Sequence, residues 1–167
     1  MASLLSSFEN PFQRHPAQGQ REQLKKLPRR VLQVFLLSRL DDLPFADIAQ
    51  RLHLTQEQVE KDMTQVLEQG RDHLQTDVSM ASHWYVRLQC AATTASERID
   101  FRRWLDADPA HLHAFHATEL HWRALLAPAR ELGKGQWYRQ PRRSLGMGSW
   151  SLLLLTLSVL GLGCLWY

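Results

Sequence analysis

The sequence predicts an all-α protein built from a helix-turn-helix module, a small three-helix module and one C-terminal transmembrane helix. Three observations lead to this prediction. Apolar residues recur every three or four positions, which is the helical period, and no stretch alternates apolar and polar residues as a half-buried strand would. Capping residues and short polar breaks separate these periodic segments. Finally, residues 150–167 contain no charged side chain.

Length and charge narrow the class of protein. A chain of 167 residues can form one ordinary domain or two very small ones. The net charge of +3 and the pI of about 9.1 are compatible with nucleic acid or an anionic membrane as partner, but require neither. The basic residues gather in two clusters, Lys25, Lys26, Arg29 and Arg30 near the start and Arg139, Arg142 and Arg143 near the end.

The residue patterns do not favour an enzyme. No nucleophile–base pair, phosphate-binding glycine loop or HExxH motif is present, so we expect neither catalysis nor a cofactor. Cys90 and Cys164 form no recognisable pair, which favours a reducing compartment, and the first residues do not resemble a signal peptide. Four histidines, His111, His113, His116 and His121, lack a carboxylate or cysteine to complete a ligand set, so we expect no metal site.

Residues 147–167 are predicted to cross a membrane. At about 1.5 Å per residue, a helix starting at Met147 would span roughly 31 Å. Trp150 at one end and Trp166 and Tyr167 at the other resemble an aromatic belt. Because the second basic cluster directly precedes this segment, the positive-inside rule predicts a single-pass protein of the bacterial inner membrane with a cytoplasmic N-terminus. Residues 128–146 would be a basic linker to this helix.

Residues 25–75 are predicted to form a helix-turn-helix, and residues 1–24 are predicted to be a flexible tail. Pro28 suits the first turn of a helix whose buried side would carry Val31, Val34, Phe35 and Leu37 or Leu40. A second, short helix follows Pro44, and His53 and Leu54 make the turn. Thr55 and Gln58 form a capping box at the start of the third helix. Its buried stripe is Val59, Met63, Val66 and Leu67.

The third helix is the candidate recognition helix. Its outer positions Gln56, Gln58, Lys61 and Gln65 can reach base edges or phosphates. The charge of this helix opposes DNA binding, since it has four acidic residues and one basic residue, Lys61. The acidic residues are Glu57, Glu60, Asp62 and Glu68. Such a helix should bind DNA poorly unless the basic cluster Lys25, Lys26, Arg29 and Arg30 compensates. A helical hairpin used only for protein contact therefore stays open as the alternative.

These features resemble region 4 of extracytoplasmic-function sigma factors, particularly those of iron uptake. The residues that carry the resemblance are Leu-Pro before the first helix, the VFLL core, LDDLPFADIA before the turn and the polar third helix. The resemblance implies that Thr55, Gln56, Gln58 and Lys61 face the −35 promoter element. His53 departs from the family, which usually has glycine in the turn, although histidine tolerates a left-handed conformation better than most residues. The chain has no room before residue 25 for the rest of a sigma factor, so it should not initiate transcription alone.

Residues 79–127 follow a short polar link and are predicted to form a second helical module. Thr94 and Glu97 form another capping box, and Asp108 with Pro109 begins the last helix. The apolar side chains expected to face inward are Trp84, Leu88, Phe101, Trp104, Leu105, Leu112, Phe115, Trp122 and Leu126. The tryptophans are interpreted as the core of a tiny bundle or, alternatively, as exposed anchors for a partner.

This module resembles the N-terminal cytoplasmic domain of FecR-like anti-sigma regulators. The resemblance rests on WYVRL at 84–88, on SERIDFRRWLDADPAHLHAF at 96–115 and on Trp122. It implies binding to a sigma factor, and the candidate contact residues are Trp84, Arg87, Leu88, Trp104, Asp108, Phe115 and Trp122. The periplasmic signalling domain of that family is absent from this chain.

The expected function is that of a membrane-anchored regulator of an extracytoplasmic-function sigma factor. Its partners would be a sigma factor or RNA polymerase, promoter DNA and the inner membrane, and the two modules would contact each other or compete for an external partner. Two alternatives remain. The chain could act as a DNA-binding regulator at −35-like elements, or it could be a degenerate fusion of sigma and anti-sigma pieces.

Overall fold

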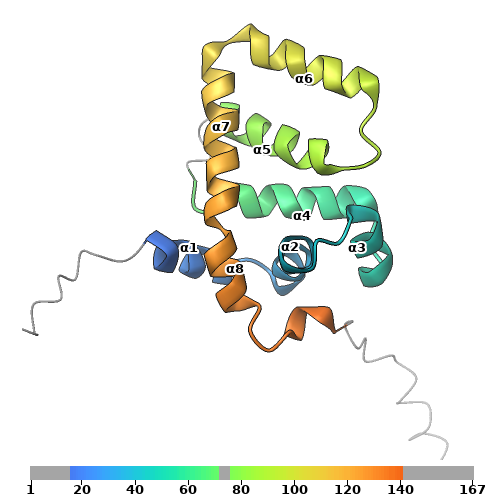
Figure 1. Ribbon diagram of the computed structural model, residues 1–167, viewed down its shortest axis with the longest axis vertical. Helices are drawn as coiled ribbons and strands as arrows, with labels where there is room; N and C mark the ends of the chain where they lie inside the picture. The colour runs from blue at the N-terminus through green and yellow to red at the C-terminus, as the bar shows by residue number, and fades with distance from the viewer. Residues whose placement is uncertain (1–15, 72–75, 141–167) are drawn as a thin grey trace, which may run out of the picture.

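The computed structural model describes residues 16–71 and 76–140, and the regular secondary structure in these ranges is entirely helical, as predicted (Figure 1). The elements, in chain order, are α1 (Pro16–Lys25), α2 (Arg29–Asp41), α3 (Phe45–Leu52), α4 (Gln56–Glu68), α5 (Thr76–Gln89), α6 (Ala95–Ala107), α7 (Pro109–Ala124), α8 (Leu126–Leu132) and the 3₁₀ helix η1 (Trp137–Arg139).

Helices α2 to α4 form the predicted helix-turn-helix module. His53 ends α3 in the left-handed conformation, with φ of 55°, so the residue that replaces the usual glycine still makes the turn. Thr55 and Gln58 form the expected capping box at the start of α4. The predicted stripe of α4 is fully buried, with Val59, Met63, Val66 and Leu67 at 0% exposure. Turn and caps together place α4 against α2 and α3.

Helices α5 to α7 form the second module. Thr94 and Glu97 cap α6 as predicted, and the Asp108 side chain accepts a hydrogen bond from the Ala110 amide at 2.8 Å at the start of α7. Phe101 of α6 packs on Phe115 of α7 with ring centroids 4.9 Å apart. The expectation that Leu112 faces inward is wrong, because its side chain is 55% exposed.

The two modules share one hydrophobic core. Trp122 of α7 is buried and packs edge-to-face on Phe35 of α2, with ring centroids 5.7 Å apart. Val86 of α5 and Cys90, directly after it, belong to the same buried cluster as the core of α2 and α4. A large interior is needed because each module is too small to bury much apolar surface alone.

Segments expected to be a tail and a linker are also part of this core. Helix α1 forms from residues predicted to be a tail, contacts α8, and contributes the buried Leu24 to the core. Beyond residue 127, α8 and η1 return to α2, where Tyr138 is buried. The buried Gln33 amide donates to the carbonyl oxygens of Tyr138 and Gln140 at 2.8 and 2.9 Å. Satisfying that amide inside the fold fixes the returning segment on α2.

The prediction of a C-terminal transmembrane helix requires correction. Within 16–71 and 76–140, no helix is long and apolar enough to cross a membrane. The longest, α7, has 16 residues, whereas a membrane span needs about 20. The segment 147–167, on which the prediction and the single-pass inner-membrane localisation rested, lies outside the described residues.

Candidate functional site: the contact between α4 and α5

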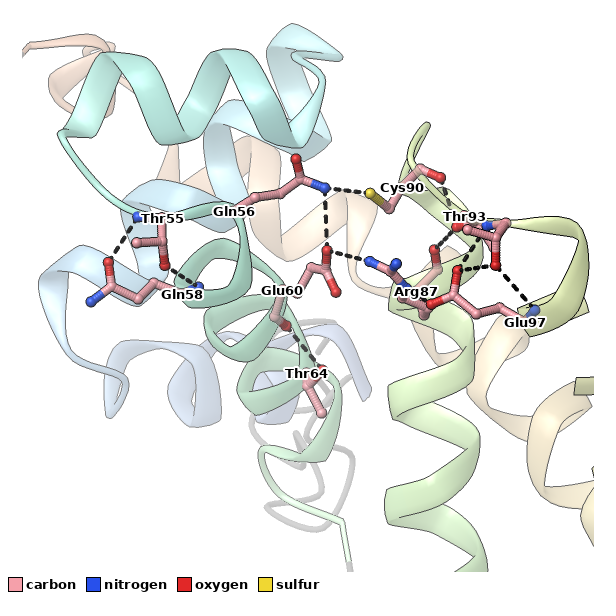
Figure 2. A network of polar contacts seen from close by, with 10 residues as sticks. Thr55, Gln56, Gln58, Glu60, Thr64, Arg87, Cys90, Thr93 and Glu97 are labelled. Atoms are coloured by element: carbon pink, nitrogen blue, oxygen red, sulfur yellow. Dashed lines mark hydrogen bonds and ion pairs between the residues drawn. The ribbon is translucent and has the colours of Figure 1, made fainter. Parts of the chain in front are cut away.

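The candidate recognition helix α4 lies alongside α5 of the second module (Figure 1). The side chains that join the two helices are Gln56 and Glu60 from α4, Arg87 from α5 and Cys90 directly after α5, with Glu97 from the start of α6 behind them (Figure 2). We call these five residues the α4–α5 seam. Because α4 is the candidate recognition helix, the seam is the place where the two modules can influence each other.

Arg87 is the central group of the seam. Its Nη1 donates to Glu60 Oε1 at 2.9 Å, and its Nε donates to Glu97 Oε1 at 2.7 Å, so one guanidinium joins α4, α5 and α6. The Arg87 side chain is 22% exposed, which leaves these ion pairs only partly screened by water. The hydrogen bond that Arg87 donates to Glu97 also raises the pKa of the guanidinium above its ordinary value. Arg87 therefore stays charged and holds both carboxylates.

The N-terminal turn of α4 is drawn into the same network. The Gln56 side-chain amide donates to Glu60 Oε1 at 3.4 Å and contacts the buried Cys90 sulfur. In a helix-turn-helix, the N-terminal residues of the recognition helix are those that contact base edges. Gln56, a candidate for such a contact, is directed at α5 in this structure (Figure 2).

The outer face of α4 remains open to solvent. Thr55, Gln58, Lys61 and Gln65 are exposed there. Next to them, an open groove of about 530 Å³ is lined by Glu57, Glu60, Lys61, Thr64, Gln65, Glu68, His83 and Val86. Three carboxylates against one ammonium make this groove acidic, so it disfavours the phosphates of DNA.

Most of the basic residues near the start of α2 contact other side chains of the protein and are not free to bind phosphates beside α4. Arg30 makes two hydrogen bonds of 2.9 Å with the buried Asp62 carboxylate of α4, and Lys25 pairs with Glu22 at 2.8 Å. The Arg29 guanidinium lies over the Trp137 ring, 5.1 Å from its centre. Among residues 16–71 and 76–140, Lys26 is the member of the cluster that is exposed without an ion pair or a cation–π contact. Arg30 thus neutralises one of the acidic charges that the sequence placed on α4.

The candidate sigma-contacting residues serve different purposes in the structure. Trp122 is in the core, Asp108 caps α7 and Arg87 belongs to the seam. Trp84, Leu88, Trp104 and Phe115 are half-buried, and Trp104 stacks on His111 with ring centroids 4.6 Å apart. The interpretation of the tryptophans as core residues therefore applies most fully to Trp122.

The seam as a unit is not predictable from the sequence, although Gln56 and Arg87 are each candidate contact residues. The sequence pattern indicates only a surface charge at Glu60 and a helix cap at Glu97. Their opposite sign to Arg87 was a usable signal, but nothing in the sequence spacing indicates that residues 60, 87 and 97 meet. Only the crossing of α4 and α5 brings them together.

Acid is expected to weaken the seam. Hydrogen bonds from Arg87, and then from Thr94, lower the pKa of Glu97 to about 2, below its ordinary 4.5. A depressed carboxyl pKa stabilises the fold at pH values above the unfolded pKa and loses that contribution as the pH falls toward the folded pKa. Between about pH 4.5 and 2, wild type should lose stability more steeply than Glu97→Gln, which keeps a capping side chain without the charge. Urea unfolding at each pH checks this, and equal slopes would contradict it.

Two family models match the chain. Residues 21–69 match sigma-70, region 4, and residues 80–120 match a domain of unknown function, DUF4880, a family like the N-terminal region of FecR. No curated protein and no solved structure matches the chain significantly. The first match covers α2 to α4 and the second half of α1, and the second covers α5 from Met80, all of α6 and most of α7. A region 4 domain implies RNA polymerase or promoter DNA as partners. The chain therefore contains a sigma-70 region 4 domain followed by a DUF4880 domain, a combination related to sigma-dependent regulation of transcription.

Proposed function

We propose that this protein modulates sigma-dependent transcription, and that its DUF4880 domain holds the recognition helix of its own region 4 domain in a state that binds promoter DNA weakly. The observation that carries the proposal is the α4–α5 seam, in which Arg87 binds Glu60 of the recognition helix at 2.9 Å. The FecR-like resemblance of the second module agrees with this, because domains of that kind bind sigma factors.

Steric reasons support weak DNA binding. The major groove of DNA is about 12 Å wide and admits one α-helix, which with its side chains is about 10–12 Å across. Helix α5 lies beside α4, and Cys90, directly after α5, contacts Gln56 in the first turn of α4. A major groove that received α4 would bring its phosphate wall against α5. Full insertion of α4 therefore requires α5 to move away.

The charges exposed on α4 also favour weak DNA binding. With Asp62 held by Arg30 and Glu60 held by Arg87, the exposed side of α4 still presents Glu57 close to Lys61. Neutralisation of phosphates dominates the affinity of proteins for DNA. The closed arrangement thus offers few cations where the recognition helix would meet the duplex.

The partner that would open the seam is a separate sigma factor or RNA polymerase. The two domains are joined by a few residues between α4 and α5, and a short tether gives an effective concentration on the order of millimolar. An external partner must overcome that internal competition. In this proposal the protein responds only to a partner that binds α4 or the facing side of α5 tightly or at high local concentration.

The proposal is tested by reversing the charge at the centre of the seam. Arg87→Glu places a carboxylate between Glu60 and Glu97, so the α4–α5 seam should open. We expect the affinity for DNA to rise by about tenfold, which corresponds to about 1.4 kcal/mol. Fluorescence anisotropy with a labelled pool of random-sequence duplexes at low salt measures this. A rise is informative because the substitution makes the protein less basic, which by itself would weaken binding.

Arg98→Glu is the matched control. Arg98 is exposed on α6 and, within the described ranges, makes no ion pair, so this variant carries the same charge change without touching the seam. Its affinity for DNA should be equal to or below that of wild type. Equal affinities for all three proteins would contradict the proposal.

A second candidate function is constitutive DNA binding, which is favoured by the exposure of Gln58, Lys61 and Gln65 on the outer face of α4. In that case wild type would already bind the duplex pool strongly and Arg87→Glu would bring no gain. The same anisotropy series therefore separates the two functions.

A further inference from the structure

A cavity of about 220 Å³ lies beyond the C-terminal end of α4, whereas the α4–α5 seam includes the first turn of α4. It is lined by α1, by the turn after α4 and by the last turn of α7, and α1 also packs on α8, which directly follows α7 (Figure 1). A Cβ added to Gly70 would lie 3.0 Å from Gln23 Cγ of α1, so the turn and α1 pack closely. We call six of the lining residues the α1–α7 joint, namely Gln20, Gln23, Leu24, Gln69, Gly70 and His121.

His121 is the titratable residue of the α1–α7 joint. Its side chain is half-buried, and its Nε2 atom is fully buried without a hydrogen-bond partner among the described residues. A neutral imidazole can leave one ring nitrogen unprotonated, whereas an imidazolium carries a proton on both. Protonation of His121 would therefore place a buried N–H group where no acceptor is present, which costs free energy.

Arg71 makes protonation of His121 still less favourable. The Arg71 Nη1 donates to the Thr118 hydroxyl at 2.8 Å, and Thr118 is buried on α7, one turn before His121. This hydrogen bond holds a guanidinium charge close to the imidazole. Burial, and in second place the charge of Arg71, lower the pKa of His121 below its ordinary 6.5.

The carboxylates on the surrounding elements do not neutralise an imidazolium in the joint. Among the described residues, none of them lines the cavity. Each is engaged by another side chain: Glu22 of α1 by Lys25, Glu68 of α4 by Ser79, Glu119 of α7 by Arg123, and Glu131 of α8 by Lys134. The charged residues of α1 and α8 that remain, Arg21 and Arg130, are cations. A positive charge on His121 thus meets only like charges.

We propose that the α1–α7 joint is a pH-sensitive switch, in which protonation of His121 separates α1 and the turn at Gly70 from the end of α7. Separation lets water hydrate the imidazolium and places it farther from Arg71. Residues 21–69 match the region 4 family and residues 80–120 match DUF4880, so Gly70 directly follows the first domain and His121 directly follows the second. Opening of the joint therefore loosens the connection between the two domains.

The direction of the pH effect follows from linkage. The closed joint binds a proton on His121 more weakly than the open joint, so it is most stable above the ordinary histidine pKa of 6.5 and loses stability as the pH falls below that value. The hydrogen bond and charge of Lys25 lower the pKa of Glu22, and those of Lys134 lower the pKa of Glu131. Both carboxylates therefore stay ionised in this range and do not contribute to the effect.

This inference does not rest on the proposed function, because the α1–α7 joint and the α4–α5 seam share no residue. The joint responds to a different pH range as well, since the acid effect on Glu97 is expected below about pH 4.5. The joint can therefore open by this mechanism whether or not α5 weakens DNA binding by α4.

Amide hydrogen exchange of the full chain, corrected for the intrinsic effect of pH, tests the switch. In wild type, the opening constant for the amides of residues 21–25 should rise at least about threefold between about pH 7.5 and 5.5. His121→Gln keeps a polar side chain that cannot be protonated, so its opening constant should stay nearly unchanged. His113→Gln is the matched control, because His113 is an exposed histidine of the same helix, and this variant should behave like wild type.

A titration of the histidine side chains of wild type by NMR gives a second, independent readout. The signal of His121 should titrate below the ordinary histidine pKa of 6.5. A His121 that titrates at or above that value would overturn the proposal, because the closed joint would then tolerate the imidazolium. A wild type whose opening constant does not rise in acid, or a rise of equal size in His121→Gln, would overturn it as well.

Discussion

Trp122→Ala is expected to lower the free energy of unfolding of the whole described fold by about 4 kcal/mol, which is the usual cost of removing a buried tryptophan. Trp122 belongs to the DUF4880 part of the chain, yet its ring contacts Phe35 of α2 with centroids 5.7 Å apart and lies under the Arg39 guanidinium at 4.7 Å. The cavity would therefore open in the core that both domains share. Region 4 helices should be destabilised as strongly as α5 and α7.

Urea unfolding followed by circular dichroism measures this change. Trp104→Ala is the matched control, because Trp104 is a half-buried tryptophan of α6, and α6 lies away from α2 and α3 (Figure 1). Its removal should cost clearly less than that of Trp122. Two separate transitions in Trp122→Ala, one of them unchanged from wild type, would show that the domains do not share a core.

Arg30→Ala should lower the free energy of unfolding by about 2 kcal/mol. Both oxygens of Asp62 accept hydrogen bonds from Arg30 at 2.9 Å, and the carboxylate is only 2% exposed. Removing one partner of a fully buried ion pair costs about 3–5 kcal/mol, because it leaves an uncompensated charge. Arg30 itself is 44% exposed, so water can reach the cavity and the cost should lie below that range.

Two further variants give this prediction a sharp test. Arg29→Ala removes a neighbouring arginine that is exposed over Trp137, and it should cost less than about 1 kcal/mol. The double variant Arg30→Met with Asp62→Leu removes both charges and should recover most of the lost stability. If Arg29→Ala were as damaging as Arg30→Ala, the ion pair would not be the cause. If the ion pair is the cause, weak DNA binding by Arg30→Ala reflects damage to the fold and not the loss of a phosphate contact.

The local features of this protein could be predicted from its sequence because short-range chemistry determines them. The capping pairs Thr55–Gln58 and Thr94–Glu97 are three residues apart, so their geometry follows from the helix itself. His53 could be placed in the turn because the residue must adopt a left-handed conformation there. The stripe of α4 followed from its helical period in the same way.

The long-range features could not be predicted in this way. Arg87 meets Glu60 and Glu97 only because α4 crosses α5, and no spacing in the sequence encodes that crossing. Tyr138 was assigned to a linker, yet its hydroxyl donates to Asp41 at 3.0 Å and its carbonyl accepts from Gln33. Leu112 was assigned to the interior because its period matched that of α7, although α7 is apolar on both sides. Periodicity identifies an apolar face but does not say what covers it.

Amide hydrogen exchange on the full chain tests most directly whether the region 4 and DUF4880 domains form one unit. The shared core predicts that the slowest amides of α2 and those of α5 and α7 exchange with the same free energy of opening, and that Trp122→Ala lowers all of them together. If α2 kept its protection in that variant while α5 and α7 lost theirs, the domains would open independently and the seam could not hold the recognition helix.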